Sequence, residues 1–157
     1  MIKIERLKIK DLSIFRRLLL KIFDEGFGYY PKNAQRYNKN HWSKKRLTEY
    51  LRKKDILMSL AWDGDEVVGY LIGEYYQSKK SSILWLGVVN AYRGRGIGTK
   101  LVCNWENWSG RKGASILKAS TANFGNEKFY KSIGFHTSTK IVKNDWGMKK
   151  LVFIKKL

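Results

Sequence analysis

The sequence predicts an α/β fold in which helices flank a mixed sheet, and two observations support this prediction. First, an apolar segment with strand character, residues 82–89, leads through a glycine-rich turn into a segment with helical spacing, and a second apolar segment, residues 114–121, follows. Two strands joined by such a helical crossover are parallel. Second, Asp63-Gly64 stands between two apolar runs, which is typical of a hairpin and therefore of an antiparallel pair.

The first third of the chain is expected to hold one strand and two helices. Alternating apolar residues predict a strand over residues 2–9. Apolar residues at three- and four-residue steps predict a helix over residues 12–22, capped by Asp11. Residues 26–40 contain the single proline of the chain and are expected to form a loop. Ser43 is expected to cap a second helix.

The rest of the chain is expected to alternate strands and helices. In chain order we expect strands over residues 56–62 and 67–76, the strand over residues 82–89, a helix from the glycine-rich turn to about residue 109, the strand over residues 114–121, a short helix over residues 126–132, and a final antiparallel pair over residues 134–142 and 148–156 with Gly147 in its turn.

Length and composition indicate one domain, residues 1–157, since 157 residues suffice for one compact core. No run of 18 apolar residues predicts a membrane span, and the first residues lack the long apolar stretch of a secretory signal. A single cysteine, Cys103, excludes an internal disulfide and fits a reducing compartment. We therefore expect a cytoplasmic protein in which Cys103 is a small buried apolar residue.

The net charge of +19 comes from 32 Lys and Arg against 13 Asp and Glu. Such a balance attracts acidic partners, including nucleic acid and ribosomes, over long range. However, the basic residues are scattered in short runs along the whole chain, and no single basic helix dominates. We expect weak and non-specific nucleic-acid binding at most.

The glycine-rich turn, residues 93–98, has the sequence Arg-Gly-Arg-Gly-Ile-Gly. It follows a predicted strand and opens a predicted helix, whose first N–H groups have no partner within the helix and point outward. The helix dipole favours negative charge at this end, and glycine lets the backbone approach a phosphate closely. The turn therefore predicts a site for a phosphorylated cofactor.

The spacing of the glycines separates three kinds of phosphate-binding loop. The chain does not match the P-loop pattern G-x-x-x-x-G-K-[ST]. It also lacks the glycine spacing of the dinucleotide-binding fingerprint and the acidic residue that this fingerprint requires at the end of the next strand. The pattern [QR]-x-x-G-x-[GA] is met by Arg93, Gly96 and Gly98. This part of the chain resembles the pyrophosphate loop of the GNAT superfamily of N-acetyltransferases.

A second segment, residues 123–135, is similar to the pattern N-x-x-A-x-x-[FL]-Y-x-x-x-G-F of the same superfamily. Asn123, Phe129, Tyr130, Gly134 and Phe135 match that pattern. The segment departs from it at residue 126, where asparagine stands in place of a small residue. Two motifs in the correct order are more specific than either alone.

The resemblance implies a mostly antiparallel sheet with a central parallel strand pair that splays apart, flanked by helices. It implies acetyl-CoA as the cofactor, with the pantetheine arm in the gap between the splayed strands and Gly87 marking the bulge that opens it. The residues implied are Leu86, Val88 and Val89 as main-chain partners of the arm, Arg93, Gly94, Arg95, Gly96, Ile97, Gly98 and Thr99 around the pyrophosphate, and Asn123 and Tyr130 beside the arm. No metal is implied.

Two side chains are candidate catalytic residues. Tyr130 matches the superfamily tyrosine that reaches the cofactor sulfur, and a phenol with a pKa near ~10 can donate a proton to a leaving thiolate. Among the acidic residues, Glu74 alone lies inside a central strand pattern, sharing a face with Tyr70 and Ile72 by alternation. Glu74 is therefore a candidate for a base that acts through water, with Glu25 as the second candidate.

These observations predict an acetyl-CoA-dependent N-acetyltransferase whose amine acceptor, a peptide, protein or small molecule, attacks the thioester directly in a ternary complex. The segment around the glycine loop is similar to that of N-terminal protein acetyltransferases. A non-catalytic acyl-CoA-binding sensor and a basic adaptor on nucleic acid or ribosomes are the alternatives. A monomer and a homodimer both remain open.

Overall fold

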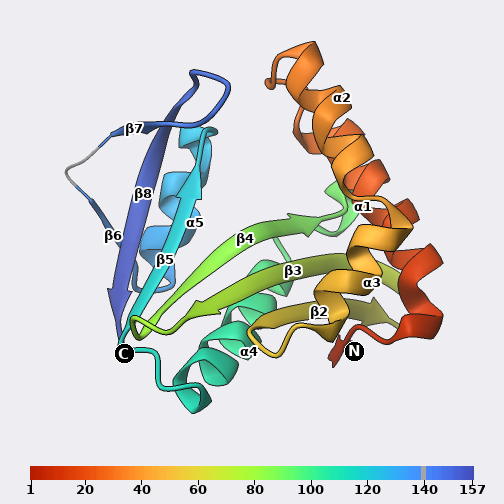
Figure 1. Ribbon diagram of the computed structural model, residues 1–157, viewed down its shortest axis with the longest axis horizontal. Coiled ribbons are helices and arrows are strands. Elements are labelled where there is room, and N and C mark those ends of the chain that lie inside the picture. Colours follow the sequence, from red (N-terminus) through yellow and green to blue (C-terminus); the bar gives the residue numbers. More distant parts are fainter. Residues whose placement is uncertain (139–140) are drawn as a thin grey trace.

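The computed structural model describes residues 1–138 and 141–157, and its described strands form an eight-stranded sheet (Figure 1). The order across the sheet is β1-β2-β3-β4-β5-β8-β6, and β7 pairs with β8 away from this path. The strands are β1 (Ile2–Arg6), β2 (Ile56–Asp63), β3 (Glu66–Tyr76), β4 (Lys80–Val88), β5 (Ile116–Thr121), β6 (His136–Thr137), β7 (Val142–Lys143) and β8 (Lys149–Lys156).

Helices cover both faces of this sheet, so the core has two parts. On one face, α4 packs its buried side chains, including Leu101 and Trp105, against β2, β3 and β5. On the other face, α1 buries Phe15 and Ile22 against β3, together with Leu47 of α3. The helices are α1 (Leu12–Gly26), α2 (Lys32–His41), α3 (Lys44–Arg52), α4 (Ile97–Arg111) and α5 (Glu127–Ser132).

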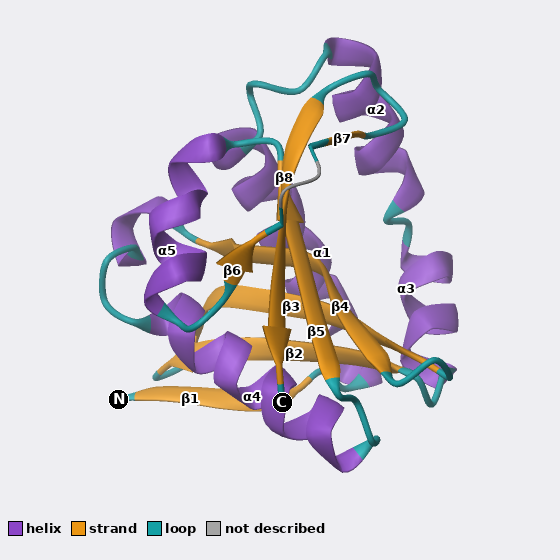
Figure 2. Ribbon diagram, turned by 90° about the vertical axis from the view of Figure 1, so that its left-hand side faces the viewer, coloured by secondary structure: helices purple, strands orange, loops and turns teal. Residues whose placement is uncertain are grey.

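The central feature of the sheet is the divergence of β4 and β5, the one parallel pair among the described strands. These two strands pair only over Lys80–Ser82 and residues 116–118. Beyond that point β5 stays paired with β8 and β4 stays paired with β3, so the two halves of the sheet separate (Figures 1 and 2). The predicted mostly antiparallel α/β architecture with a splayed parallel pair is confirmed.

A bulge lies on β4 where the strands begin to separate, at Leu84. Ile72 of β3 faces Trp85 and the next residue, Gly73, faces Ile83, so Leu84 is the extra residue. The expectation of a bulge at Gly87 was therefore wrong. Gly87 is glycine for a packing reason, because a Cβ there would lie 2.7 Å from Ile22 and 2.8 Å from the Tyr70 ring.

The main departure from the predicted elements is α2, which lies where a loop was expected. Its sequence is strongly polar, and Ala34 and Tyr37 are too few apolar residues to form the apolar stripe by which a helix is predicted. Pro31 precedes the helix, where its missing N–H costs nothing. The helix buries Ala34 and Asn38, and the Asn38 side chain donates to the Ala34 carbonyl oxygen at 2.9 Å.

The two predicted helix caps have different outcomes. Ser43 accepts a hydrogen bond from the Arg46 N–H and caps α3 as expected. Asp11 does stand directly before α1, but its side chain makes no capping bond, since a 3₁₀ turn over Ile9–Asp11 leads into the helix. Cys103 is exposed on α4, which corrects the expectation of a buried thiol.

The last part of the chain is less regular than expected. In place of one strand over residues 134–142, the structure has the short strands β6 and β7, and the part of that prediction at residues 139–140 lies outside the described residues. The strand predicted over residues 148–156 is confirmed as β8, and Gly147 lies in the preceding turn with a φ of 72°. Among the described helices, none is long and apolar enough to cross a membrane.

Candidate active site

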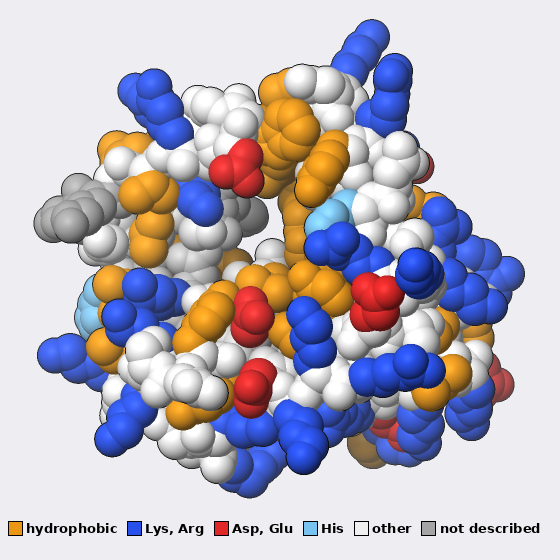
Figure 3. Space-filling view, viewed as in Figure 1, with side chains coloured by type: hydrophobic (Ala, Val, Ile, Leu, Met, Phe, Trp, Pro, Cys, Tyr) orange, Lys and Arg blue, Asp and Glu red, His pale blue; other side chains and the backbone are white. Residues whose placement is uncertain are grey.

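A pocket of about 630 Å³ occupies the wedge between β4 and β5. Its walls come from β4, the glycine-rich loop with the first turn of α4, the end of β5, α5, and the segment after α1. The space-filling view shows a hollow near the centre of this face, with hydrophobic side chains around it (Figure 3). Ten of the twelve predicted cofactor residues line this pocket, namely Leu86, Val88, Arg93, Gly94, Gly96, Ile97, Gly98, Thr99, Asn123 and Tyr130.

The glycine-rich loop presents main-chain N–H groups to one end of the pocket. Gly96 caps α4 in the left-handed conformation, with a φ of 75°, and Gly94 has a φ of 74°. The first intrahelical bond of α4 runs from the Lys100 N–H to the Gly96 carbonyl oxygen, at 3.0 Å. The N–H groups of Ile97, Gly98 and the following threonine therefore have no acceptor within the helix, and all three residues line the pocket. This end of the pocket is a cradle for an anion.

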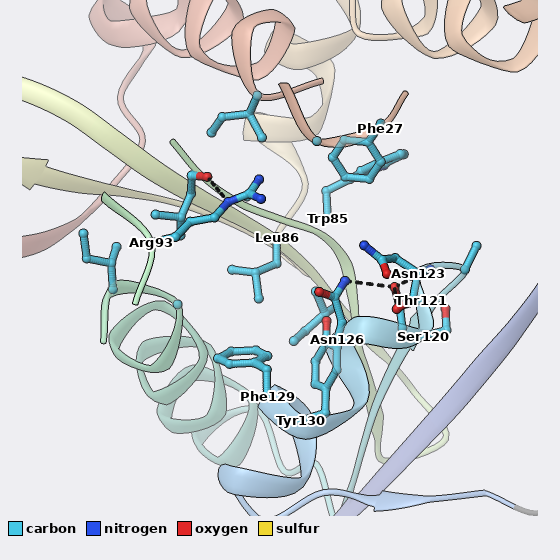
Figure 4. A pocket seen from close by; sticks show the side chains of 18 of the residues that line it. Phe27, Trp85, Leu86, Arg93, Ser120, Thr121, Asn123, Asn126, Phe129 and Tyr130 are labelled. Carbon is cyan, nitrogen blue, oxygen red and sulfur yellow. Dashed lines mark hydrogen bonds between the residues drawn. The ribbon is translucent and has the colours of Figure 1, made fainter. Parts of the chain in front are cut away.

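The two arginines of the loop have different positions. Arg93 lines the pocket, and its Nε donates to the Val88 carbonyl oxygen at 3.0 Å (Figure 4). Its guanidinium also approaches Gly26, where a Cβ would lie 2.9 Å from it. Arg95 instead lies over the Tyr92 ring, 5.1 Å from its centroid, and is absent from the pocket lining. The structure thus brings Arg93, and not Arg95, to the pocket.

The main chain of β4 faces the gap at two of its three predicted positions. Val89 donates its N–H to the Val68 carbonyl oxygen at 2.9 Å, so that group is turned toward the neighbouring strand β3. Main-chain groups alternate along a strand, so those of Leu86 and Val88 point the other way, into the wedge. Val89 is therefore not brought to the pocket with the others.

Three polar residues at the end of β5 form a closed hydrogen-bond network (Figure 4). The Thr121 hydroxyl donates to the Asn123 carbonyl oxygen at 3.2 Å and accepts from the Asn123 N–H and from Asn126 Nδ2, both at 3.1 Å. Asn123 Oδ1 accepts from the Gly125 N–H at 3.0 Å. Because the single hydroxyl proton of Thr121 is used, Asn126 must turn its NH₂ to Thr121, which leaves Asn126 Oδ1 facing the pocket beside Leu86.

Tyr130 points its hydroxyl into the pocket beside Asn126 (Figure 4). Its ring is held by stacking on Phe153, with centroids 4.6 Å apart, and by an edge contact with Phe135, and the residue is only 5% exposed. Burial raises the pKa of Tyr130 to about 12. Tyr130 is therefore a protonated donor at neutral pH. The pKa of Tyr29 is also raised, mainly by burial and then by Tyr30 and Tyr130.

The two candidate bases are not part of the pocket lining. Glu74 lies on β3 opposite Ser82, at the closed base of the wedge, and accepts a hydrogen bond from the Tyr76 hydroxyl at 2.8 Å. Glu25, near the end of α1, accepts from the Asn90 N–H at 3.1 Å. The structure does not bring either carboxylate together with Tyr130.

The opposite end of the pocket is partly aromatic and partly polar. An aromatic wall, defined here as Phe27, Tyr29, Tyr30 and Trp85, lines it, with Phe27 and Trp85 centroids 5.2 Å apart and those of the two tyrosines 5.0 Å apart. The aromatic run at residues 27–31 resembles the loop that forms an acceptor wall in the superfamily, and the structure brings it to the pocket together with Trp85. Lys150 and Asn144, from β8 and the turn before it, also line the pocket, and only the tertiary fold places them there.

The charge of the pocket is positive. Among the described residues that line it, the ionic side chains are Arg93 and Lys150, and none is Asp, Glu or His. The described residues also contain no group of three His, Cys, Asp or Glu side chains that could hold a metal ion. The site thus combines an anion cradle, main-chain groups of β4 that face the gap, and a protonated phenol.

Comparisons with known proteins agree with this geometry. The model of the acetyltransferase (GNAT) family matches residues 17–135. A mycothiol acetyltransferase of Corynebacterium efficiens is 31% identical over 83 residues, which are 53% of this chain and 27% of that protein. The chain thus spans less than a third of the length of the curated relatives it matches.

Two solved structures show how closely the fold is shared. The PaiA N-acetyltransferase of Thermoplasma acidophilum, solved with coenzyme A, has a TM-score of 0.84 at 22% identity, over 100% of this chain and 99% of that one. The ribosomal-protein-S18-alanine N-acetyltransferase of Escherichia coli has a TM-score of 0.72 at 15% identity, over 99% and 94%. The family model covers both sequence motifs and most of the chain. The protein belongs to the acetyltransferase (GNAT) family.

Proposed function

We propose that this protein, as a single domain of residues 1–157, is an acetyl-CoA-dependent N-acetyltransferase that acetylates a primary amine. The observation that supports this best is the juxtaposition of the anion cradle at Gly96–Thr99 with the buried hydroxyl of Tyr130 across one wedge between splayed strands. A diphosphate fits the cradle because unpaired N–H groups and the helix dipole both favour negative charge there.

The cofactor would be held along the length of the wedge. Gly94 and Gly96 to Thr99 would bind the diphosphate, with Arg93 lining the same pocket. The main-chain groups of Leu86 and the N–H of Val88, whose carbonyl oxygen accepts from Arg93, would pair with the pantetheine arm in the manner of an added strand. Asn126 Oδ1 would accept a hydrogen bond from an amide N–H of that arm, because it is an acceptor aimed at the gap one helical turn before Tyr130.

When bound, acetyl-CoA supplies a thioester whose acetyl group can pass to a nitrogen with release of the thiol. Tyr130 holds the proton that a departing sulfur needs, because its raised pKa keeps the phenol protonated at neutral pH. The aromatic wall and Phe129 exclude water from the sides of the wedge. The described lining offers no carboxylate or imidazole as a base, so the acceptor amine loses its proton to water.

The acceptor attacks directly from the side of the aromatic wall, without a covalent intermediate on the protein. We place the enzyme in the cytoplasm, as a monomer or homodimer, with the N-terminal protein acetyltransferases as the related subfamily suggested by the loop sequence. A non-catalytic acyl-CoA sensor is the second candidate, and the absence of a base among the described lining residues favours it. A basic adaptor on nucleic acid is supported only by the net charge of +19.

The release of free thiol distinguishes an enzyme from a sensor. The protein is incubated with acetyl-CoA and, separately, with peptide α-amines, lysine peptides, polyamines, aminoglycosides and amino acids. We expect thiol release that depends on one class of amine and that yields the acetylated product by mass spectrometry. Tight binding of acetyl-CoA with no product from any class would support the sensor and contradict the enzyme.

A further inference from the structure

The acceptor end of the pocket has two unlike sides. The aromatic wall lies on the side of α1, where Phe27 also packs against Trp85 of β4. Lys150 lies on the opposite side, on β8, next to the residue that pairs with Thr121 at the end of β5. From this arrangement, and on the basis of the proposed function, we propose that the acceptor is a small amine that also carries a carboxylate beside an apolar or aromatic body, with Lys150 binding the carboxylate.

Lys150 is available for an acidic ligand. It forms no ion pair within the described residues, and its side chain is half-buried at the pocket wall. Arg93, the other cation of the lining, lies on the α1 side of the pocket, where its Nε donates to the Val88 carbonyl oxygen and its guanidinium approaches Gly26. A carboxylate near Lys150 would therefore form a charge-assisted contact with no competing protein acid in the described lining.

Three acids on the segments that border this end are directed elsewhere. Asp24 forms an ion pair with Lys39 of α2, and Glu25 accepts from the Asn90 N–H. Asp145 is exposed at the turn between β7 and β8. None of the three lines the pocket, so an acceptor with several ammonium groups finds no counter-charge in the described lining. The net charge of +19 also repels polycations as they approach.

The aromatic wall determines the second part of the acceptor. Tyr29 and Tyr30 stand beside Phe27, with ring centroids 5.9 and 5.8 Å from it, and Trp85 completes the surface. Such a surface favours an apolar or flat body through burial and ring contacts. Tyr29 and Tyr30 line the same pocket as Tyr130, so this body would lie in the pocket that holds the candidate proton donor.

A matched pair of amines tests the carboxylate. Phenylalanine and 2-phenylethylamine share an aromatic body and a primary amine and differ by one carboxylate, and spermidine serves as a polycation. With acetyl-CoA saturating and kcat/KM expressed per concentration of neutral amine, since the two amines differ in pKa, we expect the value for phenylalanine to exceed that for 2-phenylethylamine by about tenfold, as for one charged hydrogen bond, and spermidine to be poorer still. Equal values, or a preference for spermidine, would overturn the inference.

The variant Lys150→Met tests whether Lys150 causes the preference for an amine that carries a carboxylate. We expect it to bring the phenylalanine-to-phenylethylamine ratio of kcat/KM close to one. Lys149→Met is the matched control, because Lys149 is exposed, absent from the lining and on the opposite side of the same strand, and it should keep the ratio of the unaltered protein.

The outcomes separate this inference from the proposed function. A preference for phenylalanine that survives in Lys150→Met would contradict the role of that lysine. Turnover of other amines without any preference for a carboxylate would overturn the inference and leave the N-acetyltransferase intact. No turnover with any amine, despite binding of acetyl-CoA, would overturn both.

Discussion

Tyr130 is the side chain whose chemical role can be separated most cleanly from its packing. Phenylalanine at this position keeps the stack on Phe153 and the edge contact with Phe135, and it removes only the hydroxyl that points into the pocket. We expect Tyr130→Phe to bind acetyl-CoA as the unaltered protein does and to lower kcat by about 100-fold or more. Steady-state kinetics together with calorimetric titration measure the two effects. An unchanged kcat would remove Tyr130 from the mechanism.

Asn126 offers a second test at the residue scale. Asn126→Ala removes both the donor to Thr121 and the acceptor aimed at the wedge. We expect KM for acetyl-CoA to rise by about two- to tenfold, the value of one neutral hydrogen bond, with a smaller change in kcat. Lys128→Ala is the control, since Lys128 is exposed at the start of α5 and lies outside this pocket. A fall in kcat with KM unchanged would contradict a role in holding the cofactor arm.

At the scale of elements, the packing of α4 against the sheet requires that residue 73 of β3 has no side chain. A Cβ on Gly73 would lie 2.3 Å from Cδ1 of Trp105, which is fully buried between α4 and β3. We expect Gly73→Ala to lower the free energy of unfolding by about 1–3 kcal/mol, because α4 would have to shift. Denaturant unfolding measures this. Gly28→Ala, with nothing within 4 Å of its Cβ, should change stability little, and an equal loss in both variants would contradict the explanation.

The same scale shows what sequence patterns can and cannot predict. The glycine loop and the strands around it were predictable because their signals are local, namely glycine spacing, apolar runs and the Asp-Gly turn. The helix α2 was not, because its residues carry no apolar stripe and its stability depends on tertiary contacts such as the Tyr37 ring against Trp146. The bulge at Leu84 depends on how two strands pair, which no single strand encodes.

The candidate site follows the same division. The anion cradle and Tyr130 were found from two motifs, whereas Lys150 and Asn144 reach the pocket only because β8 pairs with β5. Glu74 satisfied the one-dimensional criterion of an acid within an apolar strand. The sheet nevertheless places it at the closed base of the wedge, where β4 and β5 still pair.

At the scale of the whole molecule, the positive pocket predicts how activity depends on pH. The described residues that line the pocket include no carboxylate or imidazole that could titrate near neutral pH. The pKa of Tyr130 is raised to about 12, so its phenol stays protonated over the pH range of the assay. We expect kcat/KM to rise with pH as the acceptor amine deprotonates, with a midpoint near ~8 for a peptide α-amine and near ~10 for a lysine amine. Profiles for two such amines check this. A shared midpoint near neutrality would indicate an enzymatic base.

Binding of acetyl-CoA to the wedge is tested most directly by calorimetric titration of the unaltered protein, Gly96→Asp and Gly64→Asp. Both glycines have positive φ and open space around the Cβ, so the two variants carry similar backbone strain. Only Gly96→Asp puts a carboxylate at the anion cradle, where it would repel a diphosphate. We predict that the unaltered protein and Gly64→Asp bind acetyl-CoA alike and that Gly96→Asp, still folded by circular dichroism, does not. Equal binding by all three would contradict the assignment of the cofactor to this loop.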